Sequence, residues 1–243
     1  MTRRRSVVGY AYSTLSAFVF FFLLASCDDE TPTSGNPSTT TTTATSTASA
    51  FLRAAQLAFD ARTVDVVVNG AGGEETVAGL SYAGVSGYLE LSPGDYRVQV
   101  FPVGSRRAAV AETLVTLSDN EAVTIALVGL SSFEVTVLED NRIDSSSGAG
   151  VAMVNAIPDF PAPLDALVLN GPTLFEDVGY LETSDATELI PGLYNMQLRR
   201  AGTDETVATS MGHDFAGGAN YTIFAVGSLT RGDIRIVIAS DMH

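Results

Sequence analysis

The chain repeats itself after about 100 residues, and this internal repeat constrains the fold more than any other feature of the sequence. The matching positions are a Pro-Gly-x-Tyr turn, a strand-like segment and a single tyrosine, all displaced by 98: 93–96 with 191–194, 124–129 with 222–227, and Tyr82 with Tyr180. Each copy is long enough for one small domain. The sequence therefore predicts two tandem domains, residues 51–143 and 150–241, joined by a short polar segment.

Apolar and polar residues alternate in both copies with a period of two, which is typical of half-buried β-strands. In residues 96–100 (YRVQV) and 194–198 (YNMQL), every second residue is apolar. The Pro-Gly pairs suit the centre of a type II turn between strands, because proline presets φ and glycine tolerates positive φ. With seven or eight short strands expected in each copy and no convincing amphipathic helix, we predict an all-β protein of two immunoglobulin-like β-sandwich domains.

The first 50 residues have a different character. Residues 15–25 (LSAFVFFFLLA) are apolar but too short to span a bilayer comfortably, as in the core of a signal peptide. The LASC segment that ends at Cys27 resembles the lipobox of bacterial lipoproteins, which implies cleavage before Cys27 and acylation of that residue. We therefore predict a signal peptide over residues 1–26, and a lipidated cysteine with a Ser/Thr-rich, disordered linker over residues 27–50.

Two points about this segment stay open. Residues 7–26 are long enough to span a membrane uncleaved, in which case Cys27 would carry no lipid. The pair Arg4-Arg5 loosely resembles a twin-arginine export signal, so the sequence does not choose between Sec and twin-arginine export, nor between the inner and the outer membrane.

The charge of the chain excludes some partners. The chain has 28 acidic and 13 basic residues. All the basic residues are arginine, and ten of them follow residue 26. The processed chain would therefore carry a net charge of −18, which repels nucleic acid and anionic lipid headgroups. With one cysteine and two histidines, His213 and His243, few routes remain to a disulfide, a metal site or a histidine-dependent nucleophile. We predict no nucleic acid partner, no metal and no cofactor.

Two carboxylate pairs invite a Ca²⁺ hypothesis, Asp60 with Asp65 and Asp159 with Asp165, because loop carboxylates a few residues apart can converge on a hard cation. The alternative, which we favour, is that Asp60 and Asp159 cap turns through side-chain to backbone hydrogen bonds. In that interpretation Asp65 and Asp165 point to solvent.

Two short motifs have plain explanations. Residues 231–233 (RGD) spell a tripeptide used by some adhesins, but an exposed turn before a strand explains them. His213 and Asp214 are adjacent, yet no serine or cysteine is visibly matched to them, so the pair does not indicate a catalytic site. We predict that the protein is not an enzyme.

Both copies contain a similar series of short motifs: Asp60, Val64-Asp65-Val66 and Asn69-Gly70 in the first, Pro158-Asp159, Leu164-Asp165 and Asn170-Gly171 in the second, and a Pro-Gly-x-Tyr turn in each. This series resembles the domain of unknown function 4397, a family often found in tandem in bacterial envelope proteins. The resemblance covers residues 51 to about 241 and implies a β-rich fold without an established activity. A histidine of the family pattern falls at Gln56 and Asn155 here, so any role of that histidine is absent.

Together these features predict a non-catalytic, lipid-anchored cell-envelope protein outside the cytoplasm, attached to the membrane through Cys27. The predicted partner is an envelope protein or a glycan. Tyr82, Tyr88 and Tyr180 are the candidate binding residues, because amphipathic rings near a sheet edge can form a contact surface; the alternative is that they complete the core. Two other functions stay open, a structural spacer or assembly component of the envelope, and a hydrolase acting on an envelope or extracellular polymer.

Overall fold

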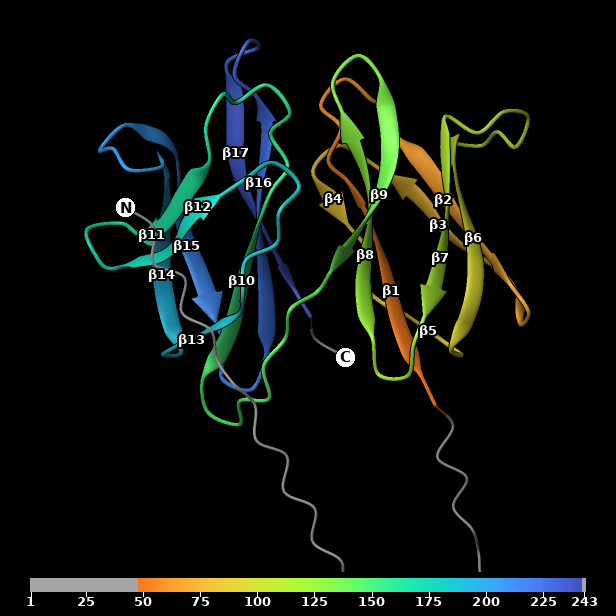
Figure 1. Ribbon diagram of the computed structural model, residues 1–243, viewed down its shortest axis with the longest axis horizontal. Coiled ribbons are helices and arrows are strands. Elements are labelled where there is room, and N and C mark those ends of the chain that lie inside the picture. Colours follow the sequence, from red (N-terminus) through yellow and green to blue (C-terminus); the bar gives the residue numbers. More distant parts are fainter. Residues whose placement is uncertain (1–47, 242–243) are drawn as a thin grey trace, which may run out of the picture. The chain divides into compact units, whose positions relative to one another are not determined.

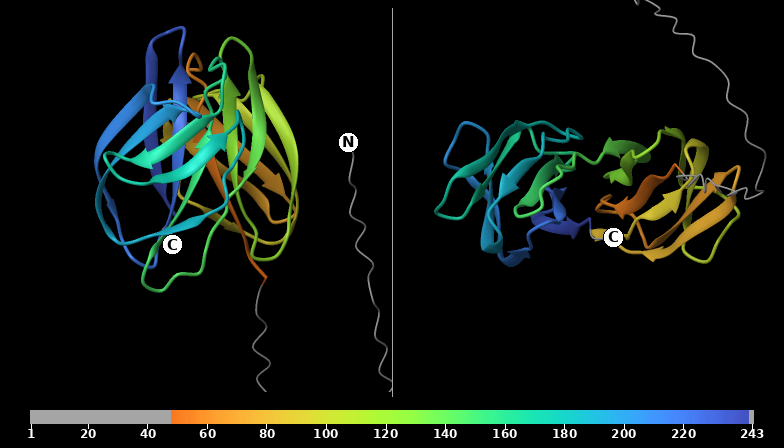
Figure 2. Two further views of the ribbon diagram at one scale, coloured as in Figure 1. Left: turned by 60° about the vertical axis from the view of Figure 1, so that its left-hand side comes forward. Right: turned by 90° about the horizontal axis from the view of Figure 1, so that it is seen from below.

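The computed structural model describes residues 48–241, so the predicted signal peptide, Cys27 and most of the linker lie outside it. All regular elements of the described residues are β-strands, which confirms the predicted all-β class. Seventeen strands form four sheets, two in each repeat, with β1–β9 in the first repeat and β10–β17 in the second (Figure 1). Each repeat is a sandwich of two facing layers (Figure 2).

The first repeat consists of sheets A and B. Sheet A has the order β4-β1-β8-β9, with β5 also paired to β1, and its strands are β1 (Ala50–Gln56), β4 (Gly84–Val85), β5 (Leu89–Leu91), β8 (Ala122–Gly129) and β9 (Phe133–Glu139). Sheet B has the order β3-β2-β6-β7, and its strands are β2 (Val64–Gly70), β3 (Gly73–Leu80), β6 (Gly94–Pro102) and β7 (Ala111–Leu117).

The second repeat has the same plan in sheets C and D. Sheet C has the order β13-β10-β16-β17, and its strands are β10 (Ala149–Asn155), β13 (Thr187–Leu189), β16 (Asn220–Ser228) and β17 (Asp233–Ser240). Sheet D has the order β12-β11-β14-β15, and its strands are β11 (Leu164–Val168), β12 (Thr173–Val178), β14 (Gly192–Arg200) and β15 (Thr206–Phe215). In both repeats the first strand pairs in parallel with a strand from near the end of the repeat, β1 with β8 and β10 with β16.

The Pro-Gly-x-Tyr motif has the same structural role in both repeats. Tyr96 donates its hydroxyl hydrogen to the carbonyl of Ser92 at 2.6 Å, and Tyr194 donates to the carbonyl of Ile190 at 2.8 Å. This bond back to a carbonyl four residues upstream resembles the tyrosine corner of immunoglobulin-like sandwiches. The two motifs join strands as predicted, but the predicted type II geometry is wrong, because glycine φ is 151° at position 94 and 157° at position 192, far from about +80°.

The carboxylates of Asp65 and Asp165 accept hydrogen bonds from backbone N–H groups of their own repeats. The carboxylate of Asp65 accepts hydrogen bonds from the backbone N–H groups of Gly79 at 2.8 Å and Gly104 at 2.9 Å. Asp165 accepts from Asp177 at 2.9 Å and Gly202 at 3.2 Å in the second repeat. The expectation that both point to solvent is wrong for Asp65, which is buried, because the N–H of Gly79, at an irregularity between β2 and β3, and the N–H of Gly104, in the turn after β6, need an acceptor.

Four strands are buried along almost their whole length, which period-two alternation does not predict. These strands are β1, β8, β10 and β16. One face of each contributes to the core of its own sandwich. The other faces form a third apolar cluster that contains residues of both repeats: Ala55, Leu57, Ala126, Val128, Leu138, Val154, Ala156, Phe224 and Val226. Sheets A and C therefore pack against each other across an apolar interface between the repeats.

Candidate functional site

A buried arginine occupies the centre of this interface. Arg53 is the only charged residue of β1 (AFLRAAQ), and its side chain lies on the face that meets the second repeat. The side chains of Arg53, Asp140 and Asp241 are at most 2 % exposed. Such buried charges are tolerated only when each one is paired and hydrogen-bonded.

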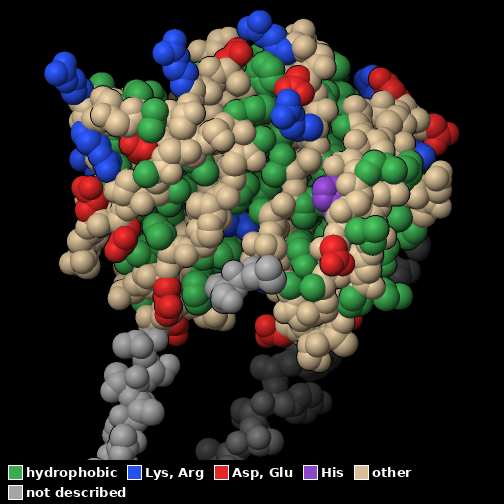
Figure 3. All heavy atoms as spheres, turned by 180° about the vertical axis from the view of Figure 1, so that it is seen from behind, with side chains coloured by type: hydrophobic (Ala, Val, Ile, Leu, Met, Phe, Trp, Pro, Cys, Tyr) green, Lys and Arg blue, Asp and Glu red, His purple; other side chains and the backbone are tan. Residues whose placement is uncertain are grey.

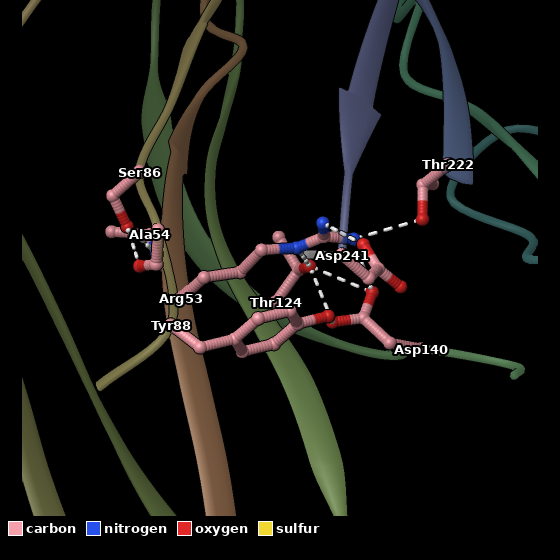
Figure 4. A network of polar contacts seen from close by, with 9 residues as sticks. Arg53, Ala54, Ser86, Tyr88, Thr124, Asp140, Thr222 and Asp241 are labelled. Atoms are coloured by element: carbon pink, nitrogen blue, oxygen red, sulfur yellow. Dashed lines mark hydrogen bonds and ion pairs between the residues drawn. The ribbon is translucent and has the colours of Figure 1, made fainter. Parts of the chain in front are cut away.

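Both repeats supply the partners of Arg53 (Figure 4). From the first repeat, Nη2 donates to Asp140 Oδ1 at 2.9 Å and Nε donates to Thr124 Oγ1 at 2.7 Å. From the second repeat, Nη2 donates to Thr222 Oγ1 at 2.8 Å, and Nη1 forms an ion pair with Asp241. Thr124 in turn donates its hydroxyl hydrogen to Asp140 at 2.7 Å. One guanidinium group therefore ties the two sandwiches together.

The electrostatics of this network keep Arg53 charged. Burial alone would lower the pKa of the guanidinium, but the nearby Asp140 and Asp241 outweigh it, so the pKa of Arg53 is raised. Burial raises the pKa of Asp241, and Arg53 opposes this rise in part. Tyr88 donates its hydroxyl hydrogen to Asp140 Oδ2 at 2.6 Å, and burial, then Asp140, raise its pKa, so the phenol remains a donor.

The partners of Arg53 are equivalent positions of the two repeats. Thr124 and Thr222 are 98 residues apart, and each is the parallel neighbour of a first-strand residue, Thr124 of Arg53 and Thr222 of Ala152. Asp140 and Asp241 each follow the last strand of a repeat, with backbone N–H groups bonded to Ala122 and Asn220, which are also 98 residues apart. The interface thus presents two equivalent Thr–Asp pairs to a single guanidinium, and alanine takes the arginine position in the second repeat.

A cleft of about 730 Å³ opens beside this network, and residues of both repeats line it. Its lining residues are Phe51, Asn120, Glu121, Ala122, Glu139, Asp140, Asn141, Arg142, Asp144, Gly218, Asn220 and Asp241. Arg142 lies 5.3 Å from the ring centroid of Phe51 and 6.0 Å from that of Tyr88, so the aromatic rings already hold a cation there. On the face shown in Figure 3, most arginines gather near the upper end, and acidic side chains lie along the lower edge.

The predicted tyrosines lie in different surroundings. Tyr88 belongs to the Arg53 network. Tyr82 packs edge-on against Phe59 at 5.2 Å and lies under Arg235 of the second repeat, and its buried hydroxyl has no hydrogen-bond partner among the described residues. Burial raises the pKa of Tyr82 to about 12, although Arg235 lowers it in part. Tyr180 is 41 % exposed. The structure does not bring the three rings into one patch, and only Tyr88 adjoins the cleft.

The carboxylate pairs do not assemble a metal site. No group of three or more His, Cys, Asp or Glu side chains within residues 48–241 is arranged to hold a metal ion. Asp159 caps the turn between β16 and β17, accepting from the backbone of Leu229 at 2.8 Å and of Thr230 at 3.0 Å, as the capping alternative predicts. Asp60 instead accepts from the side chain of Arg231 at 3.4 Å. The RGD segment begins in this exposed turn, as predicted.

Asp159 should make stability depend on pH. Partial burial would raise its pKa, but hydrogen bonds from Thr230, Ser228 and Leu229 prevail and hold it at about 2. The folded pKa lies below the unfolded value of about 4, so this stabilisation is present above about pH 4 and disappears as the pH falls toward 2. After allowance for solvent screening we expect about 1–2 kcal/mol. Unfolding measured at pH 6 and pH 2.5 should show Asp159→Asn clearly destabilised at pH 6 and much less so at pH 2.5, where most of the stabilisation has been lost, whereas Asp204→Asn, at a fully exposed side chain, should match wild type at both.

His213 has a partner that the sequence did not reveal. Its Nε2 lies 2.7 Å from the hydroxyl oxygen of Ser210, across an irregularity in β15, and burial lowers the pKa of the imidazole. The expectation that no serine accompanies His213 is therefore wrong, because the Ser210 hydroxyl lies within hydrogen-bond distance of its ring. Neither Ser210 nor His213 lines the cleft beside Arg53.

The fold and the interface together define the class: an all-β protein of two sandwich repeats that share one buried polar network. Two overlapping segments, residues 50–162 and 149–243, match the Domain of unknown function (DUF4397). The chain belongs to this family, and the predicted tandem of two such domains is confirmed. No helix of the described residues is long and apolar enough to cross a membrane.

The similarity to solved structures is distant, and no curated protein matches the chain. The TIE protein of Bacillus anthracis aligns with a TM-score of 0.24 and 10 % identity over 74 % of this chain, which covers only 34 % of the TIE chain. CBMbc (family CBM26) from Eubacterium rectale Amy13K, in complex with maltoheptaose, aligns with a TM-score of 0.26 and 11 % identity. The alignment covers 76 % of this chain and 95 % of the CBMbc chain. A fimbrial assembly protein from Parabacteroides distasonis aligns with a TM-score of 0.21 and 14 % identity, over 78 % of this chain and 94 % of the fimbrial protein. Scores this low carry no inference about activity.

Proposed function

We propose that the protein is a non-catalytic binding module of the cell envelope, lipid-anchored outside the cytoplasm, which holds its ligand in the cleft between the repeats. The observation that carries this proposal is that the cleft has walls from both sandwiches, next to a buried network that fixes one wall relative to the other. A preformed concave site with a few convergent polar groups is the usual setting for ligand binding.

The lining favours a polar, hydroxyl-rich ligand, and we take a glycan as the ligand class. The Asn120 amide and the carboxylates of Glu121, Glu139 and Asp144 line the cleft and offer hydrogen-bonding groups to the hydroxyls of a sugar. An envelope protein remains the other outcome of a binding test.

A binding screen tests this proposal. The protein of residues 48–243 would be presented to a glycan array and to envelope extracts, with and without Ca²⁺. Glu139→Arg, at the cleft end of β9, is expected to weaken binding at least about tenfold. Glu134→Arg makes the same change at the other end of β9, outside the cleft lining, and should leave binding unchanged. Binding that both variants lose equally would contradict the cleft as the site, and lack of binding in every arm would favour a structural spacer.

The lipid anchor has its own test. Cys27 follows an apolar segment and a lipobox-like LASC sequence, so Cys27→Ala is expected to abolish metabolic labelling with palmitate and to release the protein from membranes. Two acyl chains give stable anchoring where one is marginal. Labelling that persists in the Cys27→Ala variant would remove the anchor from the proposal while leaving the cleft untouched.

The third alternative is a hydrolase acting on an envelope polymer, and the contact between Ser210 and His213 gives one way to test it. Because neither residue lines the cleft beside Arg53, a serine-directed fluorophosphonate probe is expected not to label the protein. If the probe labels wild type and the label is lost in Ser210→Ala, the hydrolase alternative would be supported.

A further inference from the structure

A second cleft lies in the first repeat, and it shares no lining residue with the cleft beside Arg53. Its volume is about 650 Å³, which is within the range of small-molecule sites. The loop between β1 and β2, the loop after β3 and the end of β6 form its walls. Four of its seven lining residues are apolar or aromatic: Ala61, Tyr82, Pro102 and Val103. We call this hollow the Arg62 cleft, after the one charged residue of its lining.

Arg62 differs from most arginines of this chain, because it forms no ion pair within residues 48–241. Seven of the nine other arginines in this part of the chain pair with an Asp or Glu side chain. A guanidinium presents a planar set of N–H donors that matches the two oxygens of a carboxylate. Since the lining supplies one cation and no anion, it suits a ligand group with a single negative charge.

Two buried polar atoms at the Arg62 cleft have no hydrogen-bond partner among the described residues. One is the hydroxyl oxygen of Tyr82, whose side chain lines the cleft. The other is Oε1 of Gln56, a fully buried residue whose Nε2 donates to the carbonyl of Ala61 in the cleft wall at 3.1 Å. Buried polar atoms in native proteins are nearly always paired, so two unpaired ones at a single cleft point to a polar ligand group there.

We propose that the Arg62 cleft binds a small monocarboxylic acid with an aromatic or other apolar body. Its carboxylate pairs with Arg62, and its body covers the ring of Tyr82 and the side chain of Val103, which is 54 % exposed. Burial of apolar surface and the ion pair then act together, which neither a simple anion nor a neutral apolar molecule achieves. This site does not depend on the glycan proposed for the cleft beside Arg53.

Titration of residues 48–243 with 4-phenylbutyrate, followed by amide NMR shifts, tests this site. All four sheets and their cores lie within this segment, so it contains the complete fold. Binding with a dissociation constant of about 1 mM is expected for a ligand of this size, with the largest shifts at the cleft residues. The neutral alcohol 4-phenylbutanol should bind about fivefold more weakly, because it lacks the charge that pairs with Arg62.

Two pairs of variants locate the binding. Arg62→Gln should weaken 4-phenylbutyrate to the level of the alcohol, whereas Arg97→Gln removes the same charge from β6 outside the lining and should leave binding unchanged. Val103→Asp puts a carboxylate in the cleft and should weaken the acid at least about tenfold.

Leu114→Asp, at a 77 % exposed side chain of β7, adds the same charge outside the lining and should have no effect. No shifts at 10-fold excess over about 1 mM, equal binding of acid and alcohol, or equal losses in a variant and its control would each overturn the proposed site.

Discussion

Replacing Arg53 with alanine is expected to lower the free energy of unfolding by about 3–5 kcal/mol, the usual cost of removing one partner from a buried ion pair. The change leaves the carboxylates of Asp140 and Asp241 buried in the interface without the guanidinium that pairs with both. Urea unfolding followed by circular dichroism measures the loss. Because Arg53 joins the repeats, the variant should also show two separable unfolding transitions where wild type shows one.

Arg97→Ala is the matched control, since Arg97 forms an ion pair with Glu112 at 2.6 Å but both side chains are more than half exposed. Exposed pairs contribute little, so a change below about 1 kcal/mol is expected. A similarly small effect of Arg53→Ala would mean that the network does not stabilise the tandem.

A triple variant separates buried charge from lost packing. Arg53→Met combined with Asp140→Asn and Asp241→Asn removes all three charges and keeps most of the volume, so it should be clearly more stable than Arg53→Ala. If the triple variant is as unstable as the single one, the hydrogen bonds that Arg53 donates to Thr124 and Thr222 matter more than the charges.

The strand content of each repeat could be predicted because alternation reports a sheet with one wet face, as in β6, where Tyr96, Val98 and Val100 are buried. The order of the strands could not be predicted. The parallel pairing of Arg53 with Thr124 joins residues 71 apart, and nothing local in the sequence encodes it. The interface had a weak signal, since β8 and β16 read as continuous apolar runs, which is what burial on both faces produces.

The candidate site was harder to predict than the fold. Tyr88 was identified as an aromatic residue near an edge, but its actual role, a hydrogen bond to Asp140, depends on a residue 52 positions away. Arg53 was not identified, although a lone arginine inside an apolar strand is a signal in retrospect, because a buried charge requires partners. Those partners extend to Asp241, 188 residues away, and only the packing of the second repeat on the first brings it close.

Replacing Phe224 with alanine is expected to cost about 3–5 kcal/mol, as for other fully buried aromatic side chains. Phe224 belongs to the apolar cluster between the repeats, and its ring lies 5.8 Å from the guanidinium carbon of Arg53. Chemical unfolding measures the loss. Leu229→Ala, at a 46 % exposed side chain just beyond the same strand, should change stability by less than about 0.5 kcal/mol.

The same position tests whether the two repeats meet in a nearly twofold-symmetric way. Ala126 lies 98 positions before Phe224 and is its counterpart in the first repeat, so one repeat supplies the aromatic ring and the other an alanine. In the same way, Ala152 of the second repeat is the counterpart of Arg53. Ala126→Phe alone should overpack the cluster and destabilise by about 1–3 kcal/mol. If the interface is close to twofold symmetric, the double variant Ala126→Phe with Phe224→Ala moves the ring across the axis into the vacated space. It should then be at least about 1 kcal/mol more stable than the sum of the single effects, whereas strict additivity would show that the two positions do not share one space.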